Sequence, residues 1–428
     1  MRKKVPIEAI KNIKQTLFQT IMTAPIVVTL VLDAMGRDTL QRYLQVTRRE
    51  RSFPTLESLG LGNILTPNFH GIIAPREADI ALCAQPSSTW ADSVMGHREL
   101  MGFIDPTNYS LFMDGFPLEY VSRLETRIKR AVLYNKRAGG DEAIAVNHDE
   151  HRRTGGVILY ASMCDPIAQF AADETIIPVE ELTQIGQSGF DLALEMGIPI
   201  TRAITRPYVV KAEEYVRTGN RKDVVIALPE NTTTLIDIAQ ENGIRTISIG
   251  KCADVVNTAT WYQDRDLKGA LPQELRGLYT NGAKDKNPYS IREALIAMKE
   301  TESADRGAFI FCNLPDTDSL FGHVRNREGS LDSLEAFDKG LAILLEAMPS
   351  NGIVLVTADH GMRDGGDYGY HSREAVPIIG KAMDARLRDR IEVPTTAQTY
   401  AVLGDIAAQV FGIQREYRER CQLEKVLS

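Results

Sequence analysis

Short apolar runs alternate with amphipathic segments along much of the chain. Apolar or β-branched residues fill positions 25–32 (PIVVTLVL), 308–314 and 353–357, and runs of this length predict buried strands. Residues 330–348 place apolar side chains on one helical face, and Pro349 ends that predicted helix. Strands separated by amphipathic helices predict an α/β fold with a mainly parallel sheet and right-handed crossovers.

The pattern changes in the middle of the chain. Residues 106–116 are loop-like, 117–133 favour a helix, and a separate strand is predicted at 157–161. The core pattern then resumes with a predicted strand at 224–228. We therefore predict a core formed by residues 1–108 and 224–428, interrupted by an inserted α/β unit at residues 109–223.

Acidic residues follow the predicted core strands. Asp33 follows the first strand, Asp316 and Asp318 follow the strand at 308–314, and Asp359 follows the strand at 353–357. In an open α/β sheet the carboxyl ends of the strands lie at one edge, where ligands bind. Each carboxylate alone is better explained by a turn or a helix cap than by a ligand site. Their joint placement at one edge favours a shared site.

Histidines accompany these carboxylates. His323 lies shortly after Asp318, His360 directly follows Asp359, and His371 lies in the loop beyond. Carboxylate and imidazole ligands without thiolate suit Mn, Zn, Fe or Mg ions. The joint pattern predicts a site for more than one metal ion, and two ions roughly 4 Å apart polarise a phosphoryl group.

A serine provides a candidate nucleophile. Ser93 follows Asp92 where a polar loop enters a predicted helix. The backbone N–H groups and the dipole of a helix N-terminus favour a bound phosphate, so a hydroxyl there suits phosphoryl transfer. A serine in this position otherwise serves as an N-cap.

The composition limits the classes of partner and the cellular compartment that are expected for the protein. The net charge of −8 argues against nucleic acid or an anionic membrane as a general partner. Five scattered cysteines, never in CxxC spacing, predict reduced thiols in a cytoplasmic protein. The longest apolar run is too short to span a bilayer. The N-terminal segment has helical spacing of apolar residues and predicts an amphipathic helix packed on the body, through Ile7, Ile10, Ile13 and Leu17.

Several motifs, taken in order, resemble those of phosphopentomutases of the alkaline phosphatase superfamily. They are VLDAMG, ADSVMGHRELMG, NLPDTDSLFGH, TADHG and HSREAVPII, with YNKRAGGDE, RAITRP and IGK in the region between. The resemblance covers nearly all of the chain beyond residue 25. It implies an α/β fold with an alkaline-phosphatase-like core, a mainly parallel β-sheet flanked by helices, and an inserted α/β cap domain at residues 109–223 that binds the substrate.

The resemblance also implies two Mn²⁺ ions, for which Zn²⁺ or Mg²⁺ are the alternatives. The equivalents of Asp33, Asp359 and His360 hold one ion in such enzymes. The equivalents of Asp318, His323 and His371 hold the other. Ser93 occupies the position of the family's phosphorylated threonine, which bridges both ions, and it keeps the nucleophilic hydroxyl.

Substrate contacts are implied in the same way. Asp165 and Arg202 match positions that hold the sugar phosphate, and Arg217 and Lys251 match phosphate contacts more loosely. The sequence departs from the family at Trp90 and Ala91, which replace a Gly-Lys pair before the nucleophile. Because these departures lie close to the predicted pocket, they leave the expected reaction in place but make the identity of the sugar uncertain.

The implied activity is that of an isomerase acting on a small phosphorylated sugar. It resembles phosphopentomutase, moving a phosphoryl group between the 1- and 5-positions of (deoxy)ribose phosphate or a related sugar through a phosphoserine. One alternative is a metal-dependent phosphatase or phosphodiesterase with the same metal site. Another is a non-catalytic, metal-binding relative.

Overall fold

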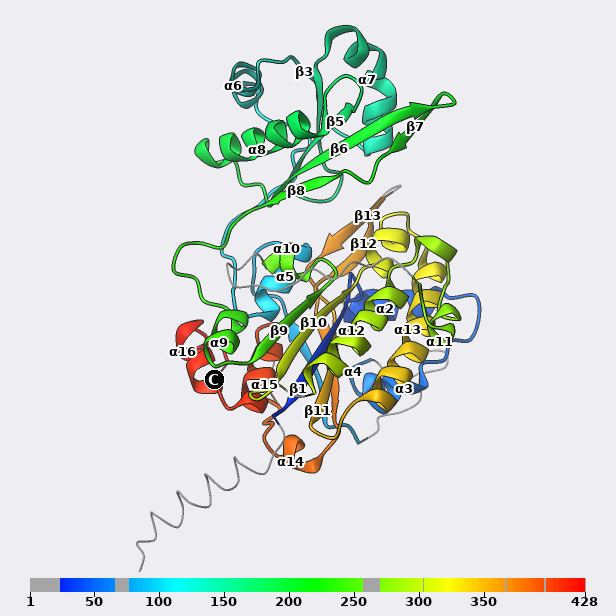
Figure 1. Ribbon diagram of the computed structural model, residues 1–428, viewed down its shortest axis with the longest axis vertical. Coiled ribbons are helices and arrows are strands. Elements are labelled where there is room, and N and C mark those ends of the chain that lie inside the picture. The colour runs from blue at the N-terminus through cyan, green and yellow to red at the C-terminus, as the bar shows by residue number, and fades with distance from the viewer. Residues whose placement is uncertain are drawn as a thin grey trace, which may run out of the picture.

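Within the described residues the chain folds around two large β-sheets, which lie one above the other in Figure 1, and it also contains a two-stranded sheet. The computed structural model describes residues 24–65, 77–256, 270–302, 304–365, 368–395 and 398–427. The amphipathic helix predicted between Ile7 and Leu17 lies outside the described residues. Across the ranges just given, no helix combines the length and the apolar character that crossing a membrane requires.

The larger sheet is mainly parallel, as predicted. Its central strand β1 (Ile26–Leu32) pairs in parallel with β10 (Ala308–Leu314) and with β11 (Gly352–Thr357). All residues of these three strands are buried, as expected for parallel strands covered on both faces. The sheet is completed by β9 (Arg245–Ile249), β14 (Val376–Ala382), β2 (Ile80–Gln85) and β15 (Gln398–Thr399). Among the described strands of this sheet, β14 alone runs antiparallel to both of its neighbours.

Helices flank the larger sheet on its two sides (Figure 1). The predicted helix at 330–348 is α13 (Arg327–Ala347), and its apolar face, including Leu334 and Leu341, is buried. Asn326 caps this helix, because its side-chain oxygen accepts a hydrogen bond from the backbone N–H of Gly329 at 3.0 Å. The other flanking helices include α2 (Arg37–Val46), α5 (Ser93–Leu100), α9 (Leu235–Glu241), α12 (Asn287–Thr301), α15 (Val402–Phe411) and α16 (Gln414–Arg420).

The smaller sheet belongs to the segment between α5 and α9 and lies beyond the carboxyl ends of β1 and β10 (Figure 1). Its strands are β3 (Val132–Arg137), β4 (Val157–Ala161), β5 (Ile167–Asp173), β6 (Arg202–Lys211), β7 (Glu214–Arg217) and β8 (Lys222–Val225). Helices α6 (Leu118–Ile128), α7 (Gly140–Thr154) and α8 (Val179–Glu195) pack on it. Apolar side chains between α6, α8 and the sheet, such as Phe170 and Leu182, form a separate core.

The expected strand at 224–228 is wrong in its place and its length. The structure has β8 at Lys222–Val225, and this strand pairs antiparallel with β6 in the smaller sheet instead of joining the larger one. The reason is that β6 offers an open edge directly after the short strand β7, so the chain pairs there before it returns to the core. A division at residue 223 would cut β8, and we propose that the inserted unit extends to Val225.

The stability of the inserted unit should depend on pH through His151. It is fully buried, its Nδ1 lies 2.6 Å from the Gly156 carbonyl oxygen, and its Nε2 accepts a hydrogen bond from the Asp173 backbone N–H at 3.0 Å. Burial lowers the pKa of His151, so the folded state holds the neutral imidazole. Its stabilisation is therefore complete above the unfolded pKa of about 6.5 and is lost as the pH falls further, through the folded pKa.

We expect His151→Ala to lower the free energy of unfolding by about 1–3 kcal/mol for each backbone group left unpaired. Urea unfolding of both proteins at about pH 8 and about pH 5.5 measures this, either side of the unfolded pKa. The difference between wild type and variant should be smaller at the lower pH. An equal difference at both would contradict the argument.

Candidate metal centre

The first cluster of ligand-type side chains forms where β1 and β11 end. Asp33 follows β1 directly, and Asp359 and His360 follow β11, so the pairing of the two strands brings them together. The carboxylates and His360 place one ligand atom each within 4.8 Å of one another. Nε2 of His360 lies 3.5 Å from Oδ1 of Asp33 and 3.5 Å from Oδ2 of Asp359. All three side chains are buried.

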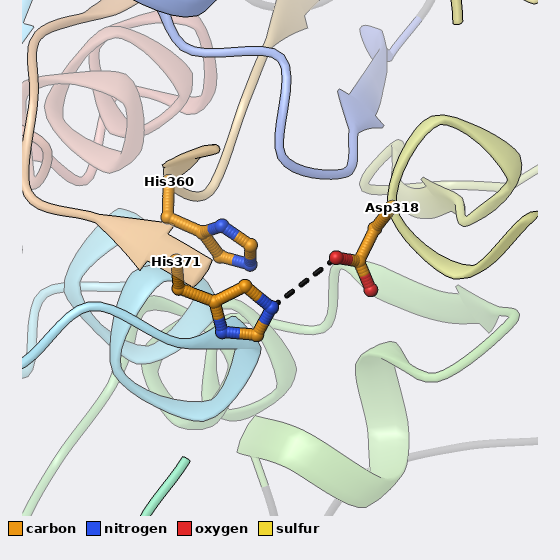
Figure 2. Close-up of side chains that lie close together, drawn as sticks. All are labelled: Asp318, His360 and His371. Atoms are coloured by element: carbon orange, nitrogen blue, oxygen red, sulfur yellow. Dashed lines mark hydrogen bonds and ion pairs between the residues drawn. The ribbon is translucent and has the colours of Figure 1, made fainter. Parts of the chain in front are cut away.

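The second cluster adjoins the first and shares His360 with it. Asp318 lies in the helical turn after β10, and His371 lies on β13 (Tyr368–Ser372), which pairs with β12 (Gly361–Gly365). Figure 2 shows the imidazole rings of His360 and His371 side by side, with the Asp318 carboxylate facing them and a dashed line joining it to His371. The ring centroids are 4.1 Å apart, and Nε2 of His371 lies 3.2 Å from Oδ1 of Asp318.

His323 completes the set that the sequence predicts for this second position. Its Nε2 lies 3.4 Å from Oδ1 of Asp318, and its ring centroid is 5.0 Å from that of His371. The structure thus brings Asp318, His323 and His371 together, while His360 is also within reach. Asp316, the other acidic residue of this loop, does not take part. Its carboxylate instead accepts hydrogen bonds from the backbone N–H groups of Lys286 and Asn287 at the start of α12.

The charges of the two clusters favour cations. Burial acts to raise the pKa of Asp318, but His323 and His371 outweigh it and hold the pKa well below the usual range. Burial likewise opposes ionisation of Asp359, whose pKa is nevertheless lowered, above all by His360. The centre therefore keeps several carboxylates ionised in a buried space.

The donor set fits divalent metal ions. It consists of carboxylate oxygens and imidazole nitrogens, the ligands that Mn, Zn and related ions accept, without a thiolate. Oδ2 of Asp359 is buried and makes no hydrogen bond within the described residues, although Nδ1 of His97 lies 3.2 Å away. A buried, ionised oxygen without such a partner is costly unless a cation neutralises it.

Ser93 is the first residue of α5 and faces the first cluster. The side chain of Asp92 caps this helix by accepting from the backbone N–H of Met95 at 2.9 Å. Oγ of Ser93 lies 3.4 Å from Oδ1 of Asp33 and 3.4 Å from Nε2 of His360. The next turn contacts Asp359 closely at Gly96, where a Cβ atom would overlap the Asp359 carbonyl oxygen. A glycine there lets α5 approach the end of β11.

Lys251 supplies a positive charge beside Ser93. Its Nζ donates a hydrogen bond to Oγ of Ser93 at 2.6 Å and forms an ion pair with Asp33. Burial acts to lower the pKa of Lys251, but the nearby carboxylates, Asp33 first, outweigh it and raise the pKa. The ammonium group therefore stays charged against Ser93.

Two further side chains position the first cluster. Nδ1 of His97 lies 2.8 Å from the Ser93 carbonyl oxygen, and its Nε2 lies 3.3 Å from the side-chain nitrogen of Asn313. That nitrogen donates to Oδ2 of Asp33 at 3.0 Å. Neither His97 nor Asn313 is among the site residues predicted from the sequence. The signal for Asn313 was a polar side chain inside an otherwise apolar buried strand.

A cavity of about 570 Å³ lies between the metal centre and the smaller sheet. Its floor includes Ser93, Asp318 and His371, and its opposite side carries an arginine wall, which we define as Arg202, Arg206, Arg217 and Arg221. The cavity therefore faces the ligand clusters and Lys251 on one side and several arginines on the other, and this concentration of cationic groups suits a small anion.

The predicted substrate contacts all line this cavity. Arg202 is mostly buried, and its Nη2 lies 4.0 Å from Oδ2 of Asp165. Arg217 forms an ion pair with Asp141 at 2.6 Å near the exposed rim.

Sequence reasoning missed the neighbouring arginines of the wall. Arg206 shares the RAITRP motif with Arg202, and residues four apart on a strand lie on one face, a signal that could have found it. Burial, and secondarily the adjacent Arg221, lower the pKa of Arg206 to about 10, as expected for crowded cations.

The chain is similar to known metalloenzymes. The family model described as the metalloenzyme superfamily matches residues 26–413. The phosphopentomutases of Thermotoga petrophila and Thermotoga maritima are each 33% identical over 362 residues, which cover 84% of this chain and 85% of the relative. A solved phosphoglycerate mutase from Leishmania mexicana aligns over 92% of this chain and 96% of its own at 13% identity, with a TM-score of 0.45.

Proposed function

Because the chain belongs to the phosphopentomutase family of the metalloenzyme superfamily, we propose that it moves a phosphoryl group between the 1- and 5-positions of (deoxy)ribose phosphate or a related sugar. Family membership confirms two expectations: an α/β fold of the alkaline-phosphatase-like class, and an enzyme of the intramolecular phosphotransferase type. The observation that carries the finer proposal is the position of the Ser93 hydroxyl, between the acidic metal centre and the cavity below the arginine wall.

A divalent metal requirement follows from the superfamily, and we propose two Mn²⁺ ions, for which Zn²⁺ or Mg²⁺ could substitute. Asp33, Asp359 and His360 would hold one ion. Asp318, His323 and His371 would hold the other, with Ser93 adjacent to both. When bound, such ions supply positive charge that stabilises a transferring phosphoryl group and favours the deprotonated form of a nearby hydroxyl.

Ser93 would carry the phosphoryl group between the two positions of the sugar. The phosphoserine P–O bond breaks as a new P–O bond forms to the free hydroxyl of a sugar monophosphate, whose proton passes to the serine oxygen, giving a sugar bisphosphate and free serine. The serine then takes the phosphoryl group from the other position and is restored as phosphoserine. Lys251 supports this role, because its ammonium group contacts Oγ and stabilises negative charge there.

The inserted unit would bind the sugar phosphate and keep water away. Asp165 and Arg202 lie on the cavity wall closest to the metal centre, and Arg217 lies nearer its rim. An arginine fork recognises phosphate oxygens in a bidentate geometry. Exclusion of water favours transfer to a sugar hydroxyl over hydrolysis. All five cysteines are free thiols, which supports a reducing, cytoplasmic setting as part of this proposal.

A phosphorus NMR assay with Mn²⁺ and a panel of sugar monophosphates tests the proposal. We expect the 1-phosphate and 5-phosphate of one pentose to interconvert without accumulation of free phosphate. Free phosphate in proportion to substrate consumed would support the phosphatase alternative instead. Absence of any turnover across the panel, by a protein that binds Mn²⁺, would support the non-catalytic one.

A further inference from the structure

The inserted unit contacts the strand that carries His371 at two neighbouring residues. Oδ1 of Asp165, in the loop between β4 and β5, lies 2.7 Å from Nδ1 of His371. Nη2 of Arg137, at the end of β3, donates a hydrogen bond to the hydroxyl of Tyr370 at 2.8 Å. His371 and Tyr370 are adjacent on β13, so both contacts bear on one short strand of the metal centre.

The two contacts form one connected group. Nε of Arg137 donates to the Met163 carbonyl oxygen at 3.1 Å, which ties the end of β3 to the loop that carries Asp165. The guanidinium group also lies over the ring of Tyr370, 5.4 Å from its centroid. The side chains of Asp165 and His371 are only 7% and 3% exposed, so their contact is shielded from water. Both atoms are buried and face one another, and within the described residues neither makes a hydrogen bond to a third group.

His371 differs from the other two histidines of the centre in what its second nitrogen contacts. Nδ1 of His360 lies 3.0 Å from the Gly361 carbonyl oxygen, and Nδ1 of His323 lies 3.1 Å from that of Gly369. Both of these acceptors are backbone atoms of the core. Nδ1 of His371 instead faces a carboxylate of the inserted unit, while its Nε2 faces Asp318.

Metal-binding histidines depend on such outer partners. A carboxylate or carbonyl group on the second ring nitrogen fixes the tautomer and the ring orientation and raises the basicity of the ligating nitrogen. For His360 and His323, the core by itself provides the partner of the second ring nitrogen. For His371 it depends on the inserted unit being docked.

We propose that the inserted unit is part of the second metal site. Asp165 orients His371 and Arg137 holds β13, so that docking of this unit raises the affinity of the site formed by Asp318, His323 and His371. By linkage, an ion in this site favours docking by the same factor. The inference rests on the proposed function for the identity of the ligands. It makes Asp165 a positioning residue for a metal ligand in addition to a wall of the substrate cavity.

The test is a Mn²⁺ titration of the metal-free protein without substrate, with free Mn²⁺ counted by electron paramagnetic resonance. Wild type should bind two ions. Asp165→Asn and Asp165→Ala should weaken one of the two sites by about 10- to 100-fold and leave the other unchanged. Arg137→Ala should weaken the same site by several-fold. Because Arg137 contacts no predicted ligand, its effect tests the contribution of docking directly.

A matched control comes from the same cavity. Asp141 lines it, pairs with Arg217 and does not contact β13 in the interactions described, so Asp141→Asn should leave both affinities unchanged. The unaffected first site in the Asp165 variants reports that their fold is intact. Unchanged binding in both Asp165 variants, or equal loss at both sites, would overturn the inference. Fewer than two ions on wild type would instead count against the proposed function.

Discussion

Ser93→Ala should abolish mutase turnover, lowering kcat by roughly four to six orders of magnitude, as removal of a catalytic nucleophile does elsewhere. The hydroxyl is the group that would accept and return the phosphoryl group, and alanine leaves no atom to carry it. Substrate binding should change little, because the arginine wall and Asp165 are untouched. Phosphorus NMR measures the turnover. Intact mass after incubation with a sugar bisphosphate should show one added phosphoryl group on wild type and none on the variant.

Two further variants separate chemistry from structure at Ser93. Ser87 is an exposed serine of the same loop, and Ser87→Ala should retain full activity. Ser93→Thr keeps the hydroxyl and should retain measurable turnover, although the added methyl group must fit a buried position. Full turnover by Ser93→Ala would show that another group carries the phosphoryl, and the mechanism would be wrong.

Removing single metal ligands should have selective effects on metal content. We expect Asp359→Ala to empty the site at Asp33, and His371→Ala to empty the site at Asp318, each with an affinity loss above about 100-fold, the upper range for loss of an outer partner. His360→Ala should weaken both, because its imidazole belongs to both clusters. Each variant should lose mutase activity, since both ions would act on the same phosphoryl group.

Metal analysis after dialysis against limiting Mn²⁺ measures these losses. His148 offers a matched histidine in the inserted unit, where its Nδ1 lies 3.0 Å from the hydroxyl of Tyr208, away from the metal centre. His148→Ala should therefore keep both ions. If Asp359→Ala and His371→Ala each lost both ions equally, the division of ligands between two sites would be untenable.

Much of the core and of its ligand set could be predicted from local sequence. The strands β1, β10 and β11 are mostly apolar, because each is buried on both faces, and such runs can be recognised in the sequence without knowledge of the neighbouring strands. Asp33, Asp318 and Asp359 follow them at positions where the polarity changes abruptly. The carboxyl ends of parallel strands share an edge, so the convergence of these residues followed from strand direction alone. The resemblance to a family added the role of Ser93.

Other parts of the site depend on contacts between distant segments. The hydrogen bond from Lys251 to Ser93, the pairing of Asp165 with His371 and that of Arg137 with Tyr370 join residues far apart in the chain. Periodicity indicates that a residue lies on a strand or in a loop, but not which element of another sheet it will meet. The arginine wall forms only because β6, β7 and the segment before β8 lie side by side over the metal centre.

The run at 224–228 shows the same division most plainly. Its β-branched residues favour a strand locally, and Val224 and Val225 do lie in β8, but that strand begins at the polar Lys222 and ends at Val225. Which sheet it joined was decided by the open edge of β6, a property of the folded inserted unit. The sequence by itself thus determined the core strands, their acidic ends and the family chemistry. Only the tertiary structure decided that the inserted unit contacts His371 as well as the cavity, because that contact exists only when two separately formed sheets are docked.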